Sequence, residues 1–358
     1  MTTNQLYHTL MQQIEQIIPQ ERITRKRVLA WLMTCLFLGR TPHAARLGNK
    51  IPGQAKKPSK AERLRRWLNN KAVRVRDWYE PIARQLIAQA TVSGQPLRLI
   101  VDGTKIGSKH QLLMVAIAYR RRALPLAWTW VRCRRGHSSA QKQLALLSYV
   151  HSLLPAGQAV QFVGDSEFGP IPVLNQLDAW SWQYVLRQKG RFLVCSNQKD
   201  IWQRFDEVVT KVGQAVWLPN SWFTAKHSYP TTLLAVWRRG EKHPWFLVTN
   251  LPDKAAALRL YSRRMWIEEL FGDFKRNGFD LEVIRLRHFL RLSRFTMAVA
   301  LLYVWLVAFG SQTIKRGERH LIDRNNKRQL SIFRIGYDML ERCLTNGDAF
   351  SLRLVPYF

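Results

Sequence analysis

Residues 97–102 read LRLIVD, an apolar run that ends in an acid. A second run of this kind, VQFVGD, occupies residues 160–165 and also ends in an aspartate. Such runs are typical of strands buried on both faces of a sheet. Because ligands collect beyond the ends of strands in open α/β sheets, Asp102 and Asp165 are candidates for a shared site. Either aspartate alone is also common where a strand passes into a turn.

The segments around these runs complete an α/β pattern. Residues 112–120 and 123–132 are apolar and β-rich, which predicts an antiparallel hairpin. A helix opened by a Ser cap is expected over 138–154, and another over 170–180 before a strand at 183–187. Three strands, a helix and a strand are the order of a ribonuclease-H-like domain, which we predict for this core.

Composition changes on both sides of the core. Residues 1–90 hold 17 Lys and Arg against five Asp and Glu, while 190–250 contain short strands rich in Trp and Val. We therefore predict a basic helical DNA-binding domain at 1–92, a catalytic core at 93–189 and 251–313, a β-strand insertion at 190–250, and a C-terminal helical tail at 314–358.

Within the basic region, helices are expected near residues 4–18, 24–38 and 60–90, with a loop at 50–60 that holds Pro, Gly and four lysines. The last helix places several basic side chains around a tryptophan. These are candidate DNA-docking residues, or else an ordinary solvated basic face; they are Arg63, Arg65, Arg66 and Lys71.

The whole chain of 358 residues is strongly basic, with 56 Lys and Arg against 24 Asp and Glu and a formal charge of +32. Such a charge repels itself in a compact fold, so a polyanionic partner is the simplest explanation. Nucleic acid comes first because neutralised phosphates release counterions. An anionic membrane surface comes second.

A membrane-spanning role is disfavoured by the length of the apolar segments. Residues 296–310, TMAVALLYVWLVAFG, are the longest such run, and a spanning helix needs about 20 residues. We predict a buried core helix there. The N-terminus lacks the basic and apolar regions of a signal peptide, and Cys35, Cys133, Cys195 and Cys343 form no Cys-x-x-Cys pair. A cytoplasmic protein with reduced thiols is expected.

The stretch YSRRMWIEELFGDFKRNG supplies a third acid. If it is one helix, Tyr261, Arg264, Glu268 and Lys275 fall within an arc of about 60° on one face, with apolar residues on another side. Glu269 is rotated by about 100° from Glu268 and is the weaker candidate. A solvated helix face with an Arg264–Glu268 pair would give the same pattern.

At this spacing the four residues resemble the Tyr-Arg-Glu-Lys signature of a large family of bacterial insertion-sequence transposases. These are DDE-type, cut-and-paste enzymes with a ribonuclease-H-like core. Asp102 in LIVDGT resembles the first catalytic aspartate of the family and Asp165 in VGDSEFG the second, although Ser-Glu follows Asp165 where an Arg is frequent. The resemblance covers residues 95–310.

The resemblance implies that Asp102, Asp165 and Glu268 are the catalytic, metal-binding residues. Three carboxylates suit Mg²⁺ or Mn²⁺, and two ions per site are expected. It also implies DNA contacts: Tyr261, Arg264 and Lys275 hold phosphates, and Trp245 in WFLVTNLP stacks on a flipped base. The expected partner is double-stranded DNA, both transposon inverted-repeat ends and target, bound by a homodimer in a synaptic complex in the bacterial cytoplasm, associated with the nucleoid.

Two other classes share part of this evidence. A ribonuclease-H-like structure-selective endonuclease or resolvase would use the same carboxylates without strand transfer. A non-catalytic DNA-binding protein would explain the charge but not three acids set in a basic chain. Glu167, two residues beyond Asp165, is either a plain turn acid or a substitute ligand.

Overall fold

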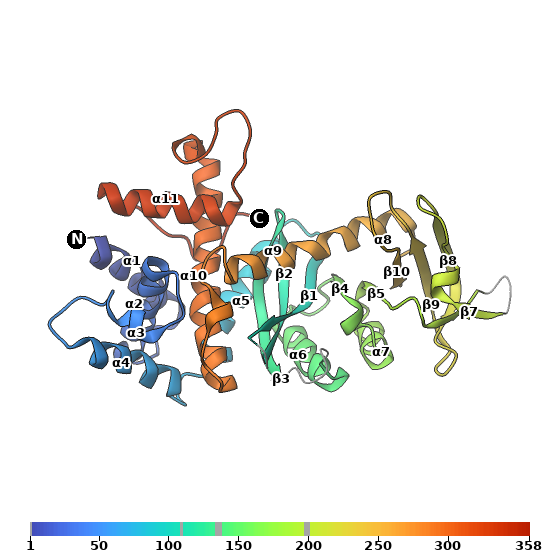
Figure 1. Cartoon of the computed structure of the whole chain (residues 1–358), viewed down its shortest axis with the longest axis horizontal. Coiled ribbons are helices and arrows are strands. Elements are labelled where there is room, and N and C mark those ends of the chain that lie inside the picture. Colours follow the sequence, from blue (N-terminus) through green and yellow to red (C-terminus); the bar gives the residue numbers. More distant parts are fainter. Residues whose placement is uncertain (1, 108–109, 133–137, 197–200) are drawn as a thin grey trace.

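One mixed sheet extends through the molecule (Figure 1) in this computed structural model, which describes residues 2–107, 110–132, 138–196 and 201–358. Its strand order is β3-β2-β1-β4-β5-β10-β9-β8-β6-β7. The strands are β1 (Leu97–Ile106), β2 (His110–Tyr119), β3 (Arg122–Arg132), β4 (Val160–Gly164), β5 (Gln183–Arg187), β6 (Leu193–Cys195), β7 (Trp202–Arg204), β8 (Ala215–Phe223), β9 (Tyr229–Val236) and β10 (Trp245–Thr249). The expected α/β class is confirmed.

The register of the central strands sets the two aspartates side by side. β1 runs parallel to β4, and the last pair of their ladder is Val101 with Gly164. The next residue on each strand is an aspartate, Asp102 or Asp165. β1 does not end at Asp102 as expected, because its antiparallel pairing with β2 continues to Ile106. Asp102 therefore lies inside a strand, at the point where the parallel neighbour stops.

The strands of residues 190–250 continue this same sheet. β10 pairs antiparallel with β5, and β9, β8, β6 and β7 follow outward. They form the right-hand end of the molecule in Figure 1. The division of the chain into domains stays a prediction, since the sheet passes without a break from the central strands into this region.

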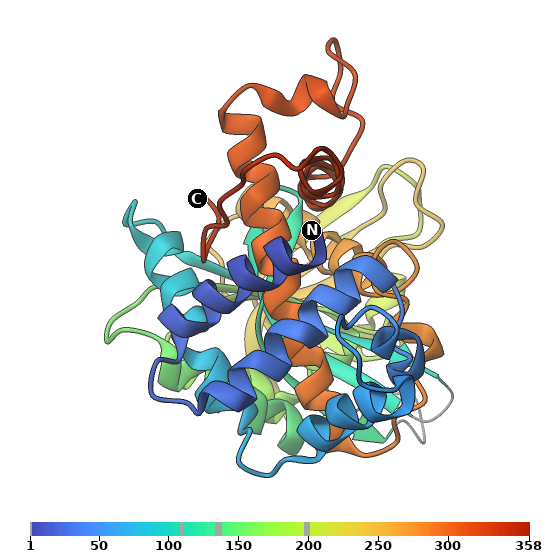
Figure 2. The ribbon, with the colours of Figure 1, turned by 90° about the vertical axis from the view of Figure 1, so that its left-hand side faces the viewer.

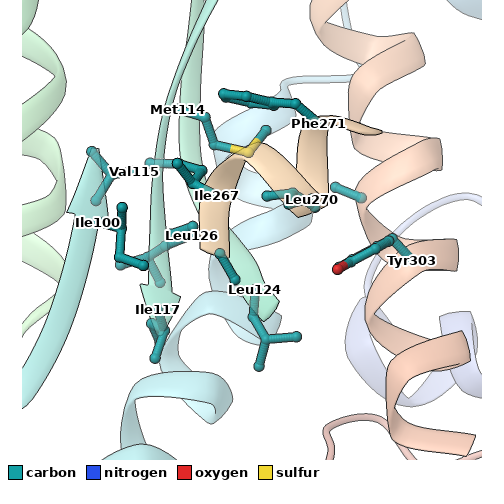
Figure 3. Close-up of a cluster of buried hydrophobic side chains, with 14 of the residues drawn as sticks. Ile100, Met114, Val115, Ile117, Leu124, Leu126, Ile267, Leu270, Phe271 and Tyr303 are labelled. Carbon is teal, nitrogen blue, oxygen red and sulfur yellow. The ribbon is translucent and has the colours of Figure 1, made fainter. Parts of the chain in front are cut away.

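Helices pack on the strands through the apolar residues expected to be buried. In Figure 1, α6 (Ala140–Leu153) and α7 (Ile171–Ala179) lie below the central strands, and α8 (Lys254–Tyr261) and α9 (Met265–Phe274) above them. Figure 3 shows Ile267 and Leu270 of α9 among buried strand side chains that include Val115 and Leu126. This packing fixes the rotation of α9 and thereby the direction of its polar side chains.

The N-terminal region is helical, as expected, but its third predicted helix is divided. The elements are α1 (Thr2–Ile17), α2 (Ile23–Gly39), α3 (Ala44–Gly48), α4 (Lys57–Asn69) and α5 (Val75–Thr91). Asn70 leaves the helical conformation, with ψ of 112°. Its side chain accepts a hydrogen bond from Ala72 N at 3.0 Å. The buried Arg294 guanidinium donates to Leu68 O and Val73 O across the same turn, so a distant residue stabilises the break.

The apolar run at 296–310 forms the middle of α10 (Phe289–Lys315), which in Figure 1 lies between helices α1 to α4 and the sheet, with α5 on the sheet side. Within the described ranges it is the one helix long and apolar enough to cross a membrane, and 94% of its most apolar window is buried in the structure. The prediction of a buried core helix is confirmed.

α11 (Ile332–Asn346) crosses α10, as Figure 2 shows, where α11 is seen along its axis beside α10. The contact requires glycine on both helices. A Cβ at Gly310 would lie 2.0 Å from Ile332 O, and one at Gly336 would lie 1.8 Å from Leu306 O. The predicted C-terminal helix is thus anchored to the core.

Three of the four cysteines lie in the described ranges. Cys35, Cys195 and Cys343 are free and buried, as expected of reduced core thiols. Cys133 lies outside the described residues.

Candidate active site

Three carboxylates from distant segments of the chain meet at one guanidinium group, that of Arg264. Its Nη2 atom lies 3.2 Å from an Asp102 carboxylate oxygen and 3.8 Å from an Asp165 oxygen. Its Nη1 atom lies 2.5 Å from a Glu268 oxygen. The three acids that the sequence singled out therefore lie together. We call them, with Arg264, the Arg264 cluster.

Local structure explains this convergence. Asp102 and Asp165 follow the last paired residues of two parallel strands. Glu268 lies in the first turn of α9, and Arg264 immediately precedes that helix, at the end of the short 3₁₀ helix η3 (Ser262–Arg264). Glu268 follows Arg264 at the i,i+4 spacing, so both project from the same helical face toward the strands.

Burial governs the protonation of Asp102, which is 8% exposed. Removal from water raises the pKa of its carboxyl to about 7, although the Arg264 charge and a hydrogen bond from Gly103 N lower it. The charges of Asp165 and Glu268 raise it further. A further cation close to Asp102 would lower this pKa and favour the ionised carboxylate.

For the guanidinium of Arg264, the neighbouring charges outweigh the effect of burial on the pKa. Burial lowers the pKa of its guanidinium, whereas the negative charges around it, that of Asp102 first, raise it, and the net change is upward. Its side chain is only 12% exposed. The guanidinium therefore acts as a fixed counter-ion for three acids at once.

The donor set fits a divalent metal ion. Three carboxylates against one guanidinium leave excess negative charge, and carboxylate oxygens are the ligands that Mg²⁺ and Mn²⁺ prefer. The Asp165 and Glu268 side chains are 33% and 43% exposed, which leaves them open to solvent. In the described part of the chain, no three His, Cys, Asp or Glu side chains are arranged so that they could hold a metal ion together. The guanidinium occupies the centre of the three acids.

The single helical face predicted for residues 261–275 is only partly formed. The chain tightens into η3 after Tyr261, and α9 ends at Phe274. Lys275 has a non-helical ψ of −127°, and its ammonium lies 3.5 Å from Glu282 in the next turn. The structure thus pairs Arg264 with Glu268 but directs Lys275 to another acid. Hydrogen bonding of Asp280 N to Lys275 O closes the turn that ends the helix.

Tyr261 and Trp245 form an aromatic pair beside the Arg264 cluster. Their ring centroids lie 4.9 Å apart in an edge-to-face arrangement. Tyr261 is buried, which raises the pKa of its hydroxyl to about 12. Trp245 is partly exposed, and the Arg238 guanidinium carbon lies 4.4 Å from its ring centroid. One face of this indole is therefore covered by a cation.

A cleft of about 490 Å³ adjoins Asp165 and contains basic residues that the sequence patterns did not single out. Arg187, Lys189 and His243 line it, together with Asp165 and Ser166. Arg187 is the last residue of β5, the strand next to β4. Because ligands collect beyond the carboxyl ends of strands in open α/β sheets, Arg187 is a candidate site residue on the same ground as the two aspartates.

Three of the predicted basic residues of the N-terminal region belong to α4, which in Figure 1 lies on the opposite side of α10 from the central strands. Arg63, Arg65 and Arg66 line a groove of about 780 Å³ with Arg25 around the buried Trp67. The guanidinium groups of Arg65 and Arg66 both approach Glu62, at 3.2 and 3.6 Å. Lys71 is exposed in the turn between α4 and α5.

Comparisons with known proteins bear directly on this site. The transposase DDE domain family matches residues 93–305, more than half of the chain, and this range contains all members of the Arg264 cluster. No curated protein sequence matches the chain. The cryo-EM structure of a piggyBac transposase synaptic complex with hairpin DNA is similar at a TM-score of 0.46 and 12% identity, covering 96% of this chain and 78% of that one. The chain therefore belongs to the transposase DDE domain family and is a DNA transposase, an enzyme that cleaves and transfers DNA strands.

Proposed function

We propose that Asp102, Asp165 and Glu268 are the catalytic carboxylates of a ribonuclease-H-like core that performs cut-and-paste transposition. Water would cleave at the transposon end, and the freed 3′ hydroxyl would then join to target DNA. The observation that carries this proposal is the meeting of the three acids at Arg264. It agrees with the family match, and the spacing of Tyr261, Arg264, Glu268 and Lys275 supports membership of the Tyr-Arg-Glu-Lys group.

Enzymes of this family generally depend on divalent metal ions. In this chain Asp102, Asp165 and Glu268 would hold two ions, Mg²⁺ or Mn²⁺. Two such ions supply electrostatic stabilisation of the attacking and leaving oxygens. The protein positions the acids from three separate segments and excludes water from Asp102 by burial.

Tyr261, Arg264 and Lys275 are proposed to hold phosphates that flank the scissile bond. Arg264 suits this role because a planar guanidinium can bind a phosphate through two hydrogen bonds, whereas Lys275 would act as a point charge. Arg187 and Lys189 extend the positive charge along the cleft beside Asp165.

Trp245 is proposed to stack on a base displaced from the DNA end. The partial exposure of Trp245 beside Tyr261 supports this role. Arg238 covers one face of the indole, so the base would stack on the other face or displace Arg238. A Trp245→Ala enzyme should nick ends normally and fail at later steps. Normal transposition by this variant would remove the assignment.

The N-terminal helices are proposed to bind double-stranded DNA through Arg63, Arg65, Arg66 and Lys71. Replacing all four by Ala should weaken end binding and make it less dependent on salt. The log–log slope should fall by about 0.9 for each phosphate that these side chains neutralise in the wild-type complex. Unchanged affinity and slope would identify an ordinary solvated face.

The remaining assignments are proposals of the same kind. The domain division given above, action as a homodimer that bridges two ends, and a cytoplasmic location at the nucleoid all follow from the resemblance and from the charge of +32.

The direct test uses DNA that carries a transposon end. Asp102→Ala, Asp165→Ala and Glu268→Ala should each abolish cleavage while DNA binding persists. Retained cleavage in any of them would defeat the assignment. A pre-cut end should be joined to target DNA by the wild-type protein, and failure of that joining would favour a structure-selective nuclease.

A further inference from the structure

Glu167 is held by side chains from other segments of the chain. It lies in the short 3₁₀ helix η1 (Ser166–Phe168), directly after Asp165. One carboxylate oxygen accepts a hydrogen bond from the Gln111 amide nitrogen at 2.8 Å. The other accepts from Ser138 N at 2.6 Å and from the Ser138 hydroxyl. Ser138, expected to cap a helix, thus donates hydrogen bonds to Glu167 instead, and both carboxylate oxygens of Glu167 accept hydrogen bonds.

A second amide completes the arrangement. The Gln143 side chain of α6 donates to Glu167 O and to the Ser138 hydroxyl, both at 2.9 Å. Gln111 and Gln143 are 3% and 1% exposed. Buried hydrogen bonds of this kind are costly to break, so the turn after Asp165 is held in one position.

The same hydrogen bonds reach the other aspartate through Gln111. A Cβ at Gly103, the residue after Asp102, would lie 2.4 Å from the Gln111 amide nitrogen. Gln111 therefore lies directly against the backbone that carries Asp102. The hydrogen bond from Gln111 to Glu167 connects the chain just after Asp102 with the chain just after Asp165.

This connection lies where the backbone ladder ends. The last β1–β4 pair is Val101 with Gly164, one residue before each aspartate. Beyond it, the mutual repulsion of two carboxylates favours separation. The side-chain bridge opposes that separation at the position where main-chain pairing no longer does.

We propose that Glu167 and Gln111 are positioning residues that fix the spacing of Asp102 and Asp165 for shared binding of a divalent cation. The inference rests on the proposed function, which makes these aspartates metal ligands. Partners that orient metal ligands in this way typically contribute 10- to 100-fold to metal affinity. Hydrogen-bond donors approach both oxygens of Glu167, and the proposal therefore gives this acid a positioning role and not a ligand role.

A conservative variant separates a positioning role from a ligand role. The Gln111 amide oxygen is buried with no hydrogen-bond partner among the described residues. In Glu167→Gln the Gln111 amide can rotate, so that its oxygen accepts from the new amide nitrogen while the new amide oxygen still accepts from Ser138. The bridge is kept and the negative charge is lost.

The experiment measures Mn²⁺ binding to the metal-free full-length protein, without DNA, from the loss of the free-ion signal in electron paramagnetic resonance. Glu167→Ala and Gln111→Ala should each weaken binding by about 10- to 100-fold. Glu167→Gln should stay within about threefold of wild type. The matched control is Gln161→Ala, which removes an exposed hydrogen bond between Gln161 of β4 and Gln183 of β5 and should change nothing.

Each other outcome has a definite meaning. Equal loss in Glu167→Gln and Glu167→Ala, with wild-type binding by Gln111→Ala, would make Glu167 a ligand and overturn the inference. Wild-type affinity in all three variants would overturn it while leaving the proposed function intact. Wild-type Mn²⁺ binding that Asp102→Asn and Asp165→Asn do not weaken would defeat the proposed function itself.

Discussion

Two arginine–carboxylate clusters lie on different sides of α9, and adjacent glutamates belong to different ones. Glu268 pairs with Arg264. Glu269 pairs with Arg122 at 2.9 Å, and the same guanidinium lies 3.2 Å from Asp273. We call this second group the Arg122 cluster. Both clusters consist of Arg, Asp and Glu side chains, and their glutamates are consecutive residues of α9.

The difference lies in charge balance and access. In the Arg264 cluster three carboxylates share one cation, and two of them are open to solvent. In the Arg122 cluster two carboxylates share one cation; Asp273 is 3% exposed, whereas the Glu269 side chain is 55% exposed. The Arg264 cluster therefore has one more carboxylate for its cation, and this larger excess of negative charge favours the binding of a metal ion. Similar pairs can therefore serve chemistry or structure.

The largest expected effect is a difference in cleavage rate between two single variants, Glu268→Gln and Glu269→Gln. Glu268→Gln removes a charge from the cluster with excess carboxylates and should reduce end cleavage by roughly 10³-fold or more. Glu269→Gln should leave cleavage within about threefold of wild type, because Glu269 does not belong to the Arg264 cluster. Cleavage rates on a labelled end measure both. A large loss in Glu269→Gln would end the distinction between the clusters.

An intermediate effect is expected for the dependence of Mn²⁺ affinity on pH. The pKa of Asp102 is raised to about 7, so the carboxyl binds a proton as pH falls through neutrality and must lose it to hold a metal ion. Mn²⁺ affinity should fall about tenfold between pH 8 and pH 6. Titrations at the two pH values, in matched ionic strength, measure this. Asp102→Asn should remove the dependence, and a wild-type affinity that stays constant would contradict the assignment.

The smallest effect concerns stability and the Arg122 cluster. Burial raises the pKa of Asp273 to about 7, against the lowering effect of Arg122. The folded chain therefore keeps a proton that the unfolded chain loses between about pH 4 and 7, and stability falls as pH rises through this window. The decrease in Tm from pH 5 to pH 8 should be smaller in Asp273→Asn than in wild type, by roughly 2 °C. Equal decreases would show that Asp273 does not titrate in this range.

Local patterns in the sequence were sufficient for the strands, the apolar face of α9 and the buried helix α10. Alternation and apolar run length report burial directly. They were insufficient for the break at Asn70 and for the direction of Lys275, because each depends on partners far away or in a following turn: Arg294 for the first, Glu282 and Asp280 for the second.

By itself the sequence determined which acids were candidates. Two apolar runs that each end in an acid singled out Asp102 and Asp165, and the i,i+4 spacing singled out Arg264 with Glu268. Only the tertiary structure decided that one guanidinium would contact all three acids, and that Glu167 would be bound by Gln111 and Ser138. The physical reason is that burial and hydrogen bonding between distant segments depend on where the chain returns, which no local periodicity encodes.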